Sequence, residues 1–507
     1  MRKRLLSILL ILLVSLAVLL VGVFKVPMKE IPKPSEKTEE VVSTLDKETV
    51  YIWYSDDTLT NYLNSAAVAY NEKYQTRIMP VLQSPLEYLE AINEATVNDE
   101  GPDAYILPHS SLVKAYMAGL AQEITLSGEM FERSYIGQAD NSVTCKDKRV
   151  GYPMFFETPV LLYNETYLTA MADTKNAQLD AEREAAQTVE EGESSDAADA
   201  AGDTAGDDAA DAGDVSADAE EGEVDDPGYI TAMDLIPTTI GNIEDLAEAY
   251  DAPEGVESFL KWDVSDVFFN YFFLGDAINV GGDAGWDTNQ IDIYNEDAIK
   301  CITEYQKLNQ FFSIDSSNSD YSQVVNEFME GKIVFTLATS DVIATLENAR
   351  AEGTFSFDYG VALIPDMNDE IDTRAMSVTN CMVINPFSEK TDIANDFAYF
   401  ATCEFAGEMY AKSMKVPVAK NITYDYEAFN IYAMEYGYSA PLPKMMETSN
   451  LWVQLEAAFK DVWDGEDPNA TLRHLAEKIM YQISGKVTTL DTIELPEEED
   501  DTEYDAW

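Results

Sequence analysis

The sequence predicts an α/β fold in a globular protein of two or three domains. From residue 49 onward, short β-prone runs alternate with helical runs, an order typical of parallel strands joined by right-handed crossovers. Hydrophobic residues make up 46% of the chain and aromatic residues 11%, which indicates a real hydrophobic core. At 507 residues, the chain is long enough to form more than one such core.

Five elements open the folded part of the chain, in the order strand, helix, strand, helix, strand. The expected strands cover residues 50–54, 77–82 and 104–107, and the expected helices cover residues 59–74 and 85–98. Ligands of such sheets collect at the carboxyl ends of the strands. Residues 55–58 and 108–111 are therefore the first candidates for a binding site.

Glu157 is the one carboxylate in an apolar, β-prone run at residues 151–164, GYPMFFETPVLLYN. A buried acid needs hydrogen-bond donors or a ligand, because an unpaired charge in apolar surroundings costs several kcal/mol. Glu157 is therefore a candidate site residue. The alternative is that side chains alternate along a strand and that Glu157 points to water.

Regular elements resume near residue 229, after a long acidic segment. The expected helices cover residues 243–250, 256–260, 295–311, 322–330, 392–401, 405–414, 451–462 and 470–483. Further strands are expected at residues 332–338, 357–364 and 376–384. The aromatic run at residues 267–274, VFFNYFFL, is too short to span a membrane and is expected in the core.

The N-terminus predicts a membrane anchor. Arg2, Lys3 and Arg4 precede an apolar run at residues 5–24, and about 20 such residues span a bilayer as a helix. The basic flank stays in the cytoplasm, so the body lies outside the cell. A cleaved signal is the alternative, although the small residues Ser15 and Ala17 lie inside the run rather than after it. Residues 25–48 then form a polar tether.

The chain is strongly acidic, with 94 Asp and Glu against 32 Lys and Arg and a net charge of −62. Such a charge repels polyanions, so nucleic acid is excluded as a partner. Residues 173–228 lack large apolar side chains and are expected to form a disordered acidic insertion, and residues 485–507 form an acidic tail. The Asp-rich spacing of the insertion does not follow the order of ligands in a calcium-binding loop.

Metal and thiol chemistry have little support in the sequence. The chain has two histidines, His109 and His474, and four scattered cysteines, with no CxxC pair and no HExxH helix. We therefore expect no cofactor and no metal. A single disulfide and four free thiols both remain open, and buried free thiols are favoured.

Several stretches, in order, resemble the extracellular solute-binding proteins of carbohydrate ABC transporters, the group that includes the maltose- and maltodextrin-binding proteins. These stretches are VYIWYSDD from Val50, GPDAYILPHSSL from Gly101, GYPMFFETPVLLYNETYL from Gly151, FMEGKIVFTLATS from Phe328, FDYGVALIP from Phe357 and PLPKMMETSNLWVQL from Pro441. They extend over residues 49–484, interrupted by the acidic insertion. Their order and spacing, rather than any one motif, carry the resemblance.

The resemblance implies a two-lobed periplasmic-binding-protein-like fold of type II, with a sugar held in an interlobe cleft. The first lobe would comprise residues 49–158 and 366–415, and the second residues 159–365 and 416–484. Crossings between the lobes would lie near residues 155–159, 362–365 and 415–418. The resemblance also implies a monomeric binding protein rather than an enzyme, anchored outside a Gram-positive cell, which captures an oligosaccharide and delivers it to an ABC permease.

Site residues follow from the same resemblance, position by position. Asp57, Glu157 and Asp266 match family carboxylates that bind sugar hydroxyls, which a carboxylate accepts in pairs. The other positions around the family's cleft are His109, Ser110, Asp341, Asn450 and Trp452. Leu107, Ser110 and Asp341 stand where the maltose-binding pattern has aromatic or acidic residues, so a different oligosaccharide remains open.

Other interpretations of the same residues are also open. Asp57 could instead cap the helix that follows it. A glycosidase could use Asp57 and Glu157 as its carboxylate pair, but the chain lacks an independent catalytic signature. A sensory surface protein could use the same two lobes to present a ligand-bound state to a partner.

Overall fold

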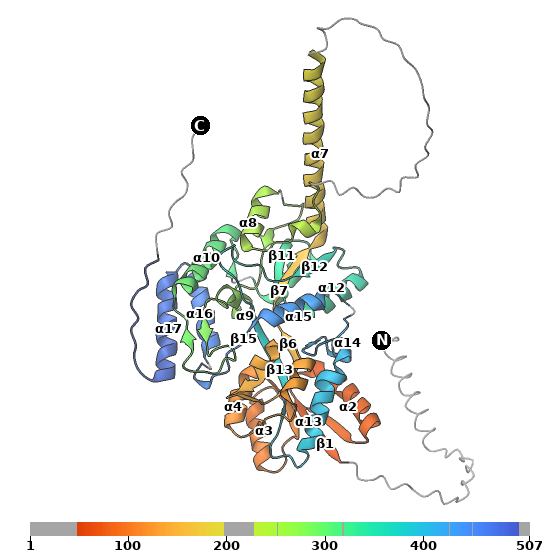
Figure 1. Ribbon diagram of the computed structural model, residues 1–507, viewed down its shortest axis with the longest axis vertical. Coiled ribbons are helices and arrows are strands. Elements are labelled where there is room, and N and C mark those ends of the chain that lie inside the picture. The colour runs from red at the N-terminus through yellow and green to blue at the C-terminus, as the bar shows by residue number, and fades with distance from the viewer. Residues whose placement is uncertain are drawn as a thin grey trace, which may run out of the picture. The chain divides into compact units, whose positions relative to one another are not determined.

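The computed structural model describes residues 48–196, 228–250, 252–316, 319–424, 426–448 and 450–495 (Figure 1). The expected membrane anchor, nearly all of the tether, residues 197–227 of the acidic insertion and the tail from residue 496 lie outside these ranges. None of the helices inside them is long and apolar enough to cross a membrane.

The first sheet has the strand order β14-β6-β13-β3-β1-β2, with β15 paired to β13. Its strands are β1 (Thr49–Tyr54), β2 (Arg77–Leu82), β3 (Ala104–Pro108), β6 (Tyr152–Glu157), β13 (Met376–Ile384), β14 (Val416–Pro417) and β15 (Ala440–Pro441). Strand β1 is parallel to β2 and β3, and β13 is antiparallel to both β3 and β6. The carboxyl ends of β1, β2, β3 and β6 therefore lie at one edge of the sheet.

The second sheet has the strand order β12-β7-β11-β8. Its strands are β7 (Val160–Asn164), β8 (Ser258–Leu260), β11 (Ile333–Ala338) and β12 (Tyr359–Ala362). Strand β7 is antiparallel to β11 and β12, and Ala338 at the end of β11 pairs with Val160 at the start of β7. The carboxyl ends of β8, β11 and β12 lie at the same edge as the start of β7. Because β7 begins directly after β6, this is the edge at which the chain arrives from the first sheet.

Helices surround the two sheets. They are α2 (Thr60–Tyr74), α3 (Tyr88–Val97), α4 (Leu112–Met117), α5 (Gly128–Ser134), α6 (Gln138–Val143), α7 (Glu165–Asp196), α8 (Ile240–Ala249), α9 (Val267–Asn270), α10 (Glu296–Phe312), α11 (Tyr321–Met329), α12 (Asp341–Glu352), α13 (Thr391–Tyr399), α14 (Met409–Ser413), α15 (Ala428–Tyr438), α16 (Leu451–Trp463) and α17 (Pro468–Ser484). Helix α2 shows the common pattern, because it buries Tyr62, Leu63, Ala66 and Tyr70, which share one helical face.

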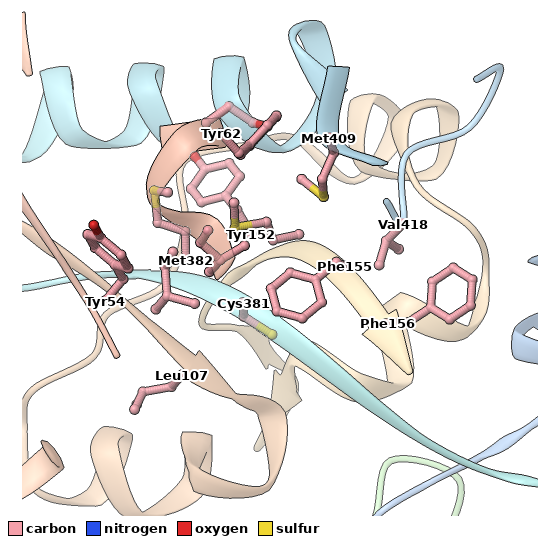
Figure 2. Packing of buried hydrophobic residues seen from close by; sticks show 14 of the residues in the cluster. Tyr54, Tyr62, Leu107, Tyr152, Phe155, Phe156, Cys381, Met382, Met409 and Val418 are labelled. Atoms are coloured by element: carbon pink, nitrogen blue, oxygen red, sulfur yellow. The ribbon is translucent and has the colours of Figure 1, made fainter. Parts of the chain in front are cut away.

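The first hydrophobic core lies between the strands of the first sheet and their helices. Figure 2 shows part of it, with side chains of β1, β3, β6 and β13 meeting side chains from α2 and α14. Tyr54, Phe155 and Met382 are all buried there. All four cysteines of the chain are free thiols, and three of them are buried.

Helix α15 contacts both sheets. The Tyr436 ring stacks on Phe156 of β6, with 4.2 Å between ring centroids and 13° between planes. Tyr432, one turn earlier, donates a 3.1 Å hydrogen bond from its hydroxyl to the carbonyl of Ala338 in β11. Between these two tyrosines, Glu435 accepts a 3.1 Å hydrogen bond from the amide of Ile364, just after β12. One helix thus holds the first sheet to the second.

Two predictions from the sequence are wrong. Residues 256–260 were expected to be helical, but Ser258–Leu260 form β8, paired in parallel with β11. So short an apolar run does not distinguish the two structures by its periodicity. Disorder was expected from residue 173, but α7 continues as one helix to Asp196 (Figure 1). Its Ala, Glu, Gln and Lys residues are strong helix formers, which outweighs the repulsion among its acidic side chains.

The chain returns to the body of the fold beside α7. The side-chain amide of Asn176 donates a 2.8 Å hydrogen bond to the carbonyl of Ile230 and accepts one of 2.9 Å from the amide of Ile230. Arg183 lies over the ring of Tyr229, with 5.1 Å between its guanidinium carbon and the ring centroid. The two ends of the acidic insertion are therefore held side by side.

Candidate functional site

Two carboxylates meet a single lysine at the carboxyl edge of the first sheet. Asp56 follows β1, Glu157 ends β6, and Lys415 immediately precedes β14. Lys415 Nζ lies 2.8 Å from Glu157 Oε1 and 3.3 Å from Asp56 Oδ2. It also lies 5.2 Å from the centroid of the Phe155 ring. Neither alternative for Glu157 therefore holds as stated, because one of its carboxylate oxygens is paired with the Lys415 ammonium group.

Both Asp56 and Lys415 are stabilised in their charged forms. Burial opposes ionisation of Asp56, but hydrogen bonds from Thr58 and the charge of Lys415 outweigh it and lower the Asp56 pKa. Burial also opposes the charge of Lys415, yet Glu157 and Asp56 raise the Lys415 pKa on balance. The pair is thus charged at neutral pH.

The helix cap after β1 is Asp56 rather than Asp57. Asp56 Oδ1 accepts hydrogen bonds from the amide and the hydroxyl of Thr58, at 3.0 and 2.6 Å. Asp57 is the first residue of the short 3-10 helix η1 (Asp57–Leu59), and its side chain is exposed. The capping role considered for Asp57 is therefore wrong, and Asp57 presents its carboxylate to solvent at the sheet edge.

His109 is a structural residue. The ring is completely buried, Nε2 donates a 2.8 Å hydrogen bond to the carbonyl of Leu442, and Nδ1 accepts one of 2.9 Å from the amide of Thr379. Burial and the nearby charge of Lys444 lower the pKa of His109 to about 3, so the ring is neutral. Because both ring nitrogens are engaged, the structure contradicts the predicted ligand role of His109.

Ser110 and Trp452 line one cavity of about 460 Å³, which we call the Trp452 cavity. Ser110 follows β3 at the sheet edge, and Trp452 lies in the first turn of α16. The rest of the wall consists of residues 442–446, Ser111, Lys114 and Leu451. The volume lies within the range of small-molecule sites, about 300–1,000 Å³. The structure therefore brings together two predicted site residues that are distant in sequence.

Trp452 also begins a row of aromatic rings. Its ring faces Phe268, at 6.3 Å between centroids and 30° between planes. Phe268 follows Asp266, whose carboxylate accepts a 2.8 Å hydrogen bond from the Phe268 amide and so caps α9. Burial raises the pKa of Asp266, and Asp263 and Glu456 add to that effect. The Asp266 carboxylate thus lies one hydrogen bond from the backbone of Phe268, whose ring faces Trp452.

Asp341 and Asn450 lie near opposite ends of this aromatic row. Phe269, next to Phe268, stacks on Tyr321 at 5.0 Å, and the Tyr321 hydroxyl donates a 3.3 Å hydrogen bond to Asp341. Asp341 begins α12 after β11 and is exposed. Asn450 is an exposed residue just ahead of α16.

Sequence reasoning missed three residues of this region: Lys415, Phe268 and Tyr321. Lys415 was noticed only as part of an expected crossing, with no signal in the sequence for its two carboxylate partners. Phe268 lies in the aromatic run that was assigned wholly to the core, yet its side chain is half-buried. The only signal for it was its position two residues after Asp266.

A larger cavity, of about 820 Å³, opens beside the amino end of β3 and includes Trp53, Asp103 and Lys390 in its wall. Among the described residues, none of the predicted site residues lines it. The chemistry expected of the site is therefore at the opposite edge of the sheet. Nor do the described ranges contain a cluster of acids, histidines and cysteines able to hold a metal ion.

No protein-family model matches the chain, and no curated protein matches its sequence. Solved structures do match. An extracellular solute-binding protein from Staphylococcus aureus in complex with maltose is 17% identical, with a TM-score of 0.65, over 86% of this chain and 98% of its own. The fold is that of the maltose-binding proteins.

Two further solved structures share this fold. The maltose-binding periplasmic protein from Listeria monocytogenes, also in complex with maltose, is 20% identical, with a TM-score of 0.63, over 88% of this chain and 100% of its own. MalX from Streptococcus pneumoniae, in complex with maltopentaose, is 16% identical, with a TM-score of 0.57, over 85% of this chain and 99% of its own. These matches confirm the predicted two-lobed α/β fold.

Replacing Lys415 with methionine is expected to lower the free energy of unfolding by about 1–2 kcal/mol at pH 7. The change leaves Asp56 and Glu157 without their cation, but both are more than a third exposed, so the loss stays below the roughly 3–5 kcal/mol of a fully buried pair. The lowered Asp56 pKa stabilises the wild type fully above the usual value of 3.8, and this stabilisation is lost as pH falls through the lower pKa of the folded protein. The difference between the proteins should therefore shrink at pH 3.

Urea unfolding at pH 7 and pH 3 measures this difference. Lys412→Met is the matched control, because Lys412 lies in α14, three residues before Lys415, and pairs at 3.7 Å with the exposed Glu408. That variant should lose less than about 0.5 kcal/mol. Equal losses in the two variants would show that Lys415 is only a surface lysine.

Proposed function

We propose that this protein is the extracytoplasmic binding component of a sugar ABC transporter, which captures a maltodextrin-type oligosaccharide between its lobes and delivers it to a permease. One observation carries the proposal. The Trp452 cavity joins Ser110, at the carboxyl edge of the first sheet, to the aromatic row that begins at Trp452. Solved proteins of the same fold hold maltose or maltopentaose.

The chemistry of the region supports a sugar ligand. The rings of Trp452 and Phe268 offer flat faces for the C–H patches of a pyranose ring. Asp266 and Asp57 are acceptors for sugar hydroxyls, and the Glu157 oxygen that does not face Lys415 is a third. Lys415 fixes the Glu157 carboxylate before the ligand arrives, which reduces the entropy lost on binding.

Capture and delivery would follow from movement of the lobes about their connections. Only Thr158 and Pro159 lie between β6 of the first sheet and β7 of the second. The edge of the first sheet that carries Glu157 is therefore joined to the second sheet by a short link. A ligand that contacts both edges binds the closed form more tightly than the open form and therefore shifts the population toward it. The permease would then recognise the closed form.

Membrane attachment completes the proposal. The apolar run at residues 5–24 would hold the body at the outer face of the cell membrane, and residues 25–48 would let it reach the permease. Such a protein works as a monomer and catalyses no reaction.

Replacing Trp452 with alanine is expected to weaken binding of maltodextrins about tenfold or more, because a stacking face is lost from the wall of the Trp452 cavity. Titration calorimetry on the purified full-length chain measures this, in a detergent without a sugar headgroup. Val453→Ala is the matched control, since Val453 is the next residue of α16 and its side chain is 66% exposed. Absence of heat with every oligosaccharide tested would contradict the proposed function.

A further inference from the structure

The cavity of about 820 Å³ at the opposite edge of the first sheet has no part in the proposed sugar site. We call it the Trp53 cavity. Its wall comes mainly from Tyr51 and Trp53 of β1, from residues between the last turn of α3 and the start of β3, and from the loop after β13. The volume is within the range of ligand sites, about 300–1,000 Å³.

Hydrogen bonds fix the walls of the Trp53 cavity to one another. The side-chain amide of Asn385, in the loop after β13, donates to the carbonyl of Pro102 at 2.8 Å and to the hydroxyl of Thr96 at 3.1 Å. The side-chain oxygen of Asn385 accepts a 3.0 Å hydrogen bond from the Phe387 amide. Because Asn385 is buried, these bonds are shielded from water. The cavity is therefore formed in advance, and a ligand does not have to order it.

Three aromatic side chains of this wall keep uncovered surface. Tyr51 and Trp53 point away from the first hydrophobic core, since Ile52 between them is buried in it and side chains alternate along a strand. Tyr51 is 44% exposed, Phe387 is 68% exposed, and Trp53 is half-buried. Aromatic faces of this kind attract a cation that comes to lie over them.

Four acids and a single lysine line the Trp53 cavity. The lysine, Lys390, is already engaged. Its Nζ donates a 2.7 Å hydrogen bond to the carbonyl of Thr49 and lies 3.7 Å from Oδ2 of Asp103. The same Nζ lies 5.9 Å from the centroid of the Tyr51 ring. The chain thus places one ammonium group of its own against this aromatic wall, and Asp103 balances its charge.

The other three acids of the wall are Asp99, Glu100 and Glu389, and all three are exposed. Within the described part of the chain, their carboxylates have neither a hydrogen bond nor an ion pair. Three such charges on one wall, in a chain of net charge −62, repel one another and attract a cation. A neutral ligand would leave that repulsion in place.

We propose that the Trp53 cavity binds an arginine side chain of a partner polypeptide. A guanidinium group is flat and always charged, so it stacks on an aromatic ring while its N–H groups donate in pairs to a carboxylate. The cavity is far larger than one guanidinium group and has room for the residues beside the arginine, which favours a polypeptide over free arginine. This interaction goes beyond the proposed function, since it uses the edge of the sheet away from the sugar.

Saturation-transfer NMR on the purified full-length chain, at about 20 mM salt, tests the proposal. The probe is a pentapeptide with blocked ends and one arginine between glycines, and the same peptide with lysine or with citrulline, the neutral isostere of arginine, is compared with it. The arginine peptide is expected to bind about twofold more tightly than the lysine peptide and about fivefold or more tightly than the citrulline peptide.

Two variants of the wall should weaken binding of the arginine peptide. Phe387→Ala is expected to weaken it about twofold to fivefold, because one ring face is lost. Glu100→Gln combined with Glu389→Gln should weaken it about fivefold, and about 0.5 M salt should remove most of that difference. All three positions are exposed, so the thermal midpoint should not change.

Matched controls separate the cavity from general attraction to an acidic chain. Tyr438→Ala removes a ring that is 70% exposed, and Glu427→Gln removes an exposed acid; neither residue lines the Trp53 cavity. Both variants should bind the arginine peptide as the wild type does. Equal weakening in Phe387→Ala and Tyr438→Ala, or no weakening in either wall variant, would overturn the proposal.

The ligand series supplies the remaining outcomes. Equal binding of the arginine and citrulline peptides would overturn the proposal, because the charge would then play no part. Binding of N-acetyl-arginine amide as tight as that of the pentapeptide would overturn the assignment to a polypeptide and replace it with a small ligand. Maltose affinity should be unchanged in Phe387→Ala, so this proposal and the proposed function fail independently of each other.

Discussion

Replacing Tyr436 with alanine is expected to lower the free energy of unfolding by about 3–5 kcal/mol, as for other buried aromatic residues cut to alanine. Tyr436 is fully buried, its ring stacks on Phe156, and its hydroxyl shares a 2.8 Å hydrogen bond with Thr379. The truncation removes the ring and leaves a hole between α15 and the first sheet. Equilibrium urea unfolding measures the loss.

Two further variants divide this effect into its parts. Tyr436→Phe keeps the stacked ring and removes only the hydroxyl, so it should cost about 1 kcal/mol. Tyr438→Ala is the matched control, since Tyr438 ends the same helix with its side chain 70% exposed, and it should cost less than about 0.5 kcal/mol. A loss of under about 1 kcal/mol in Tyr436→Ala would show that α15 does not hold the two sheets together.

Replacing Glu435 with glutamine is expected to stabilise the protein at pH 8 by about 3 kcal/mol and to have little effect at pH 4. Burial raises the pKa of Glu435 to about 7 from 4.5, with a further contribution from Asp366, while the Ile364 amide partly opposes the shift. The folded protein therefore binds the proton more tightly than the unfolded chain. Stability falls as pH rises from about 4.5 to about 7, and the full penalty is present above that range.

Glutamine keeps the oxygen that accepts the Ile364 amide and cannot ionise, so the variant lacks this pH dependence. Urea unfolding at a series of pH values from 4 to 8 measures the difference. Glu427→Gln, at an exposed position just before α15, is the control and should leave the free energy of unfolding unchanged at every pH. A Glu435→Gln difference that stays constant across this range would mean that Glu435 titrates in the folded protein as it does in water.

Strands of the first sheet are the part of the fold that sequence predicts best. Strands β2 and β13 have the expected bounds, because apolar residues dominate each short run. Strands of the second sheet are harder to predict from the sequence, since β8 has only three residues and owes its conformation to pairing with β11. The first sheet also continues through β14 to Pro417, two residues past the expected limit of the first lobe.

Part of the candidate site was predictable from the residues alone, because the strand ends pointed to residues 55–58 and 108–111 and the apolar run pointed to Glu157, whereas Trp452 came only from the resemblance to known proteins. Ser110 and Trp452 lie in one cavity, as their shared assignment to a cleft requires. The pairing of Glu157 with Lys415 joins residues 258 positions apart, and no local pattern encodes such a contact. His109 has the residue type expected of a ligand, but only its buried contacts with Leu442 and Thr379 reveal that it serves the fold.

Asn176 has a consequence for how the length of the acidic insertion affects stability. Because its amide bonds both backbone groups of Ile230, the chain leaves and rejoins the body at one clamped point. The free energy of closing a flexible loop grows only with the logarithm of its length, by about 0.6 kcal/mol for each doubling. A change in the number of residues between Asn176 and Ile230 is therefore expected to alter the stability of the body by little.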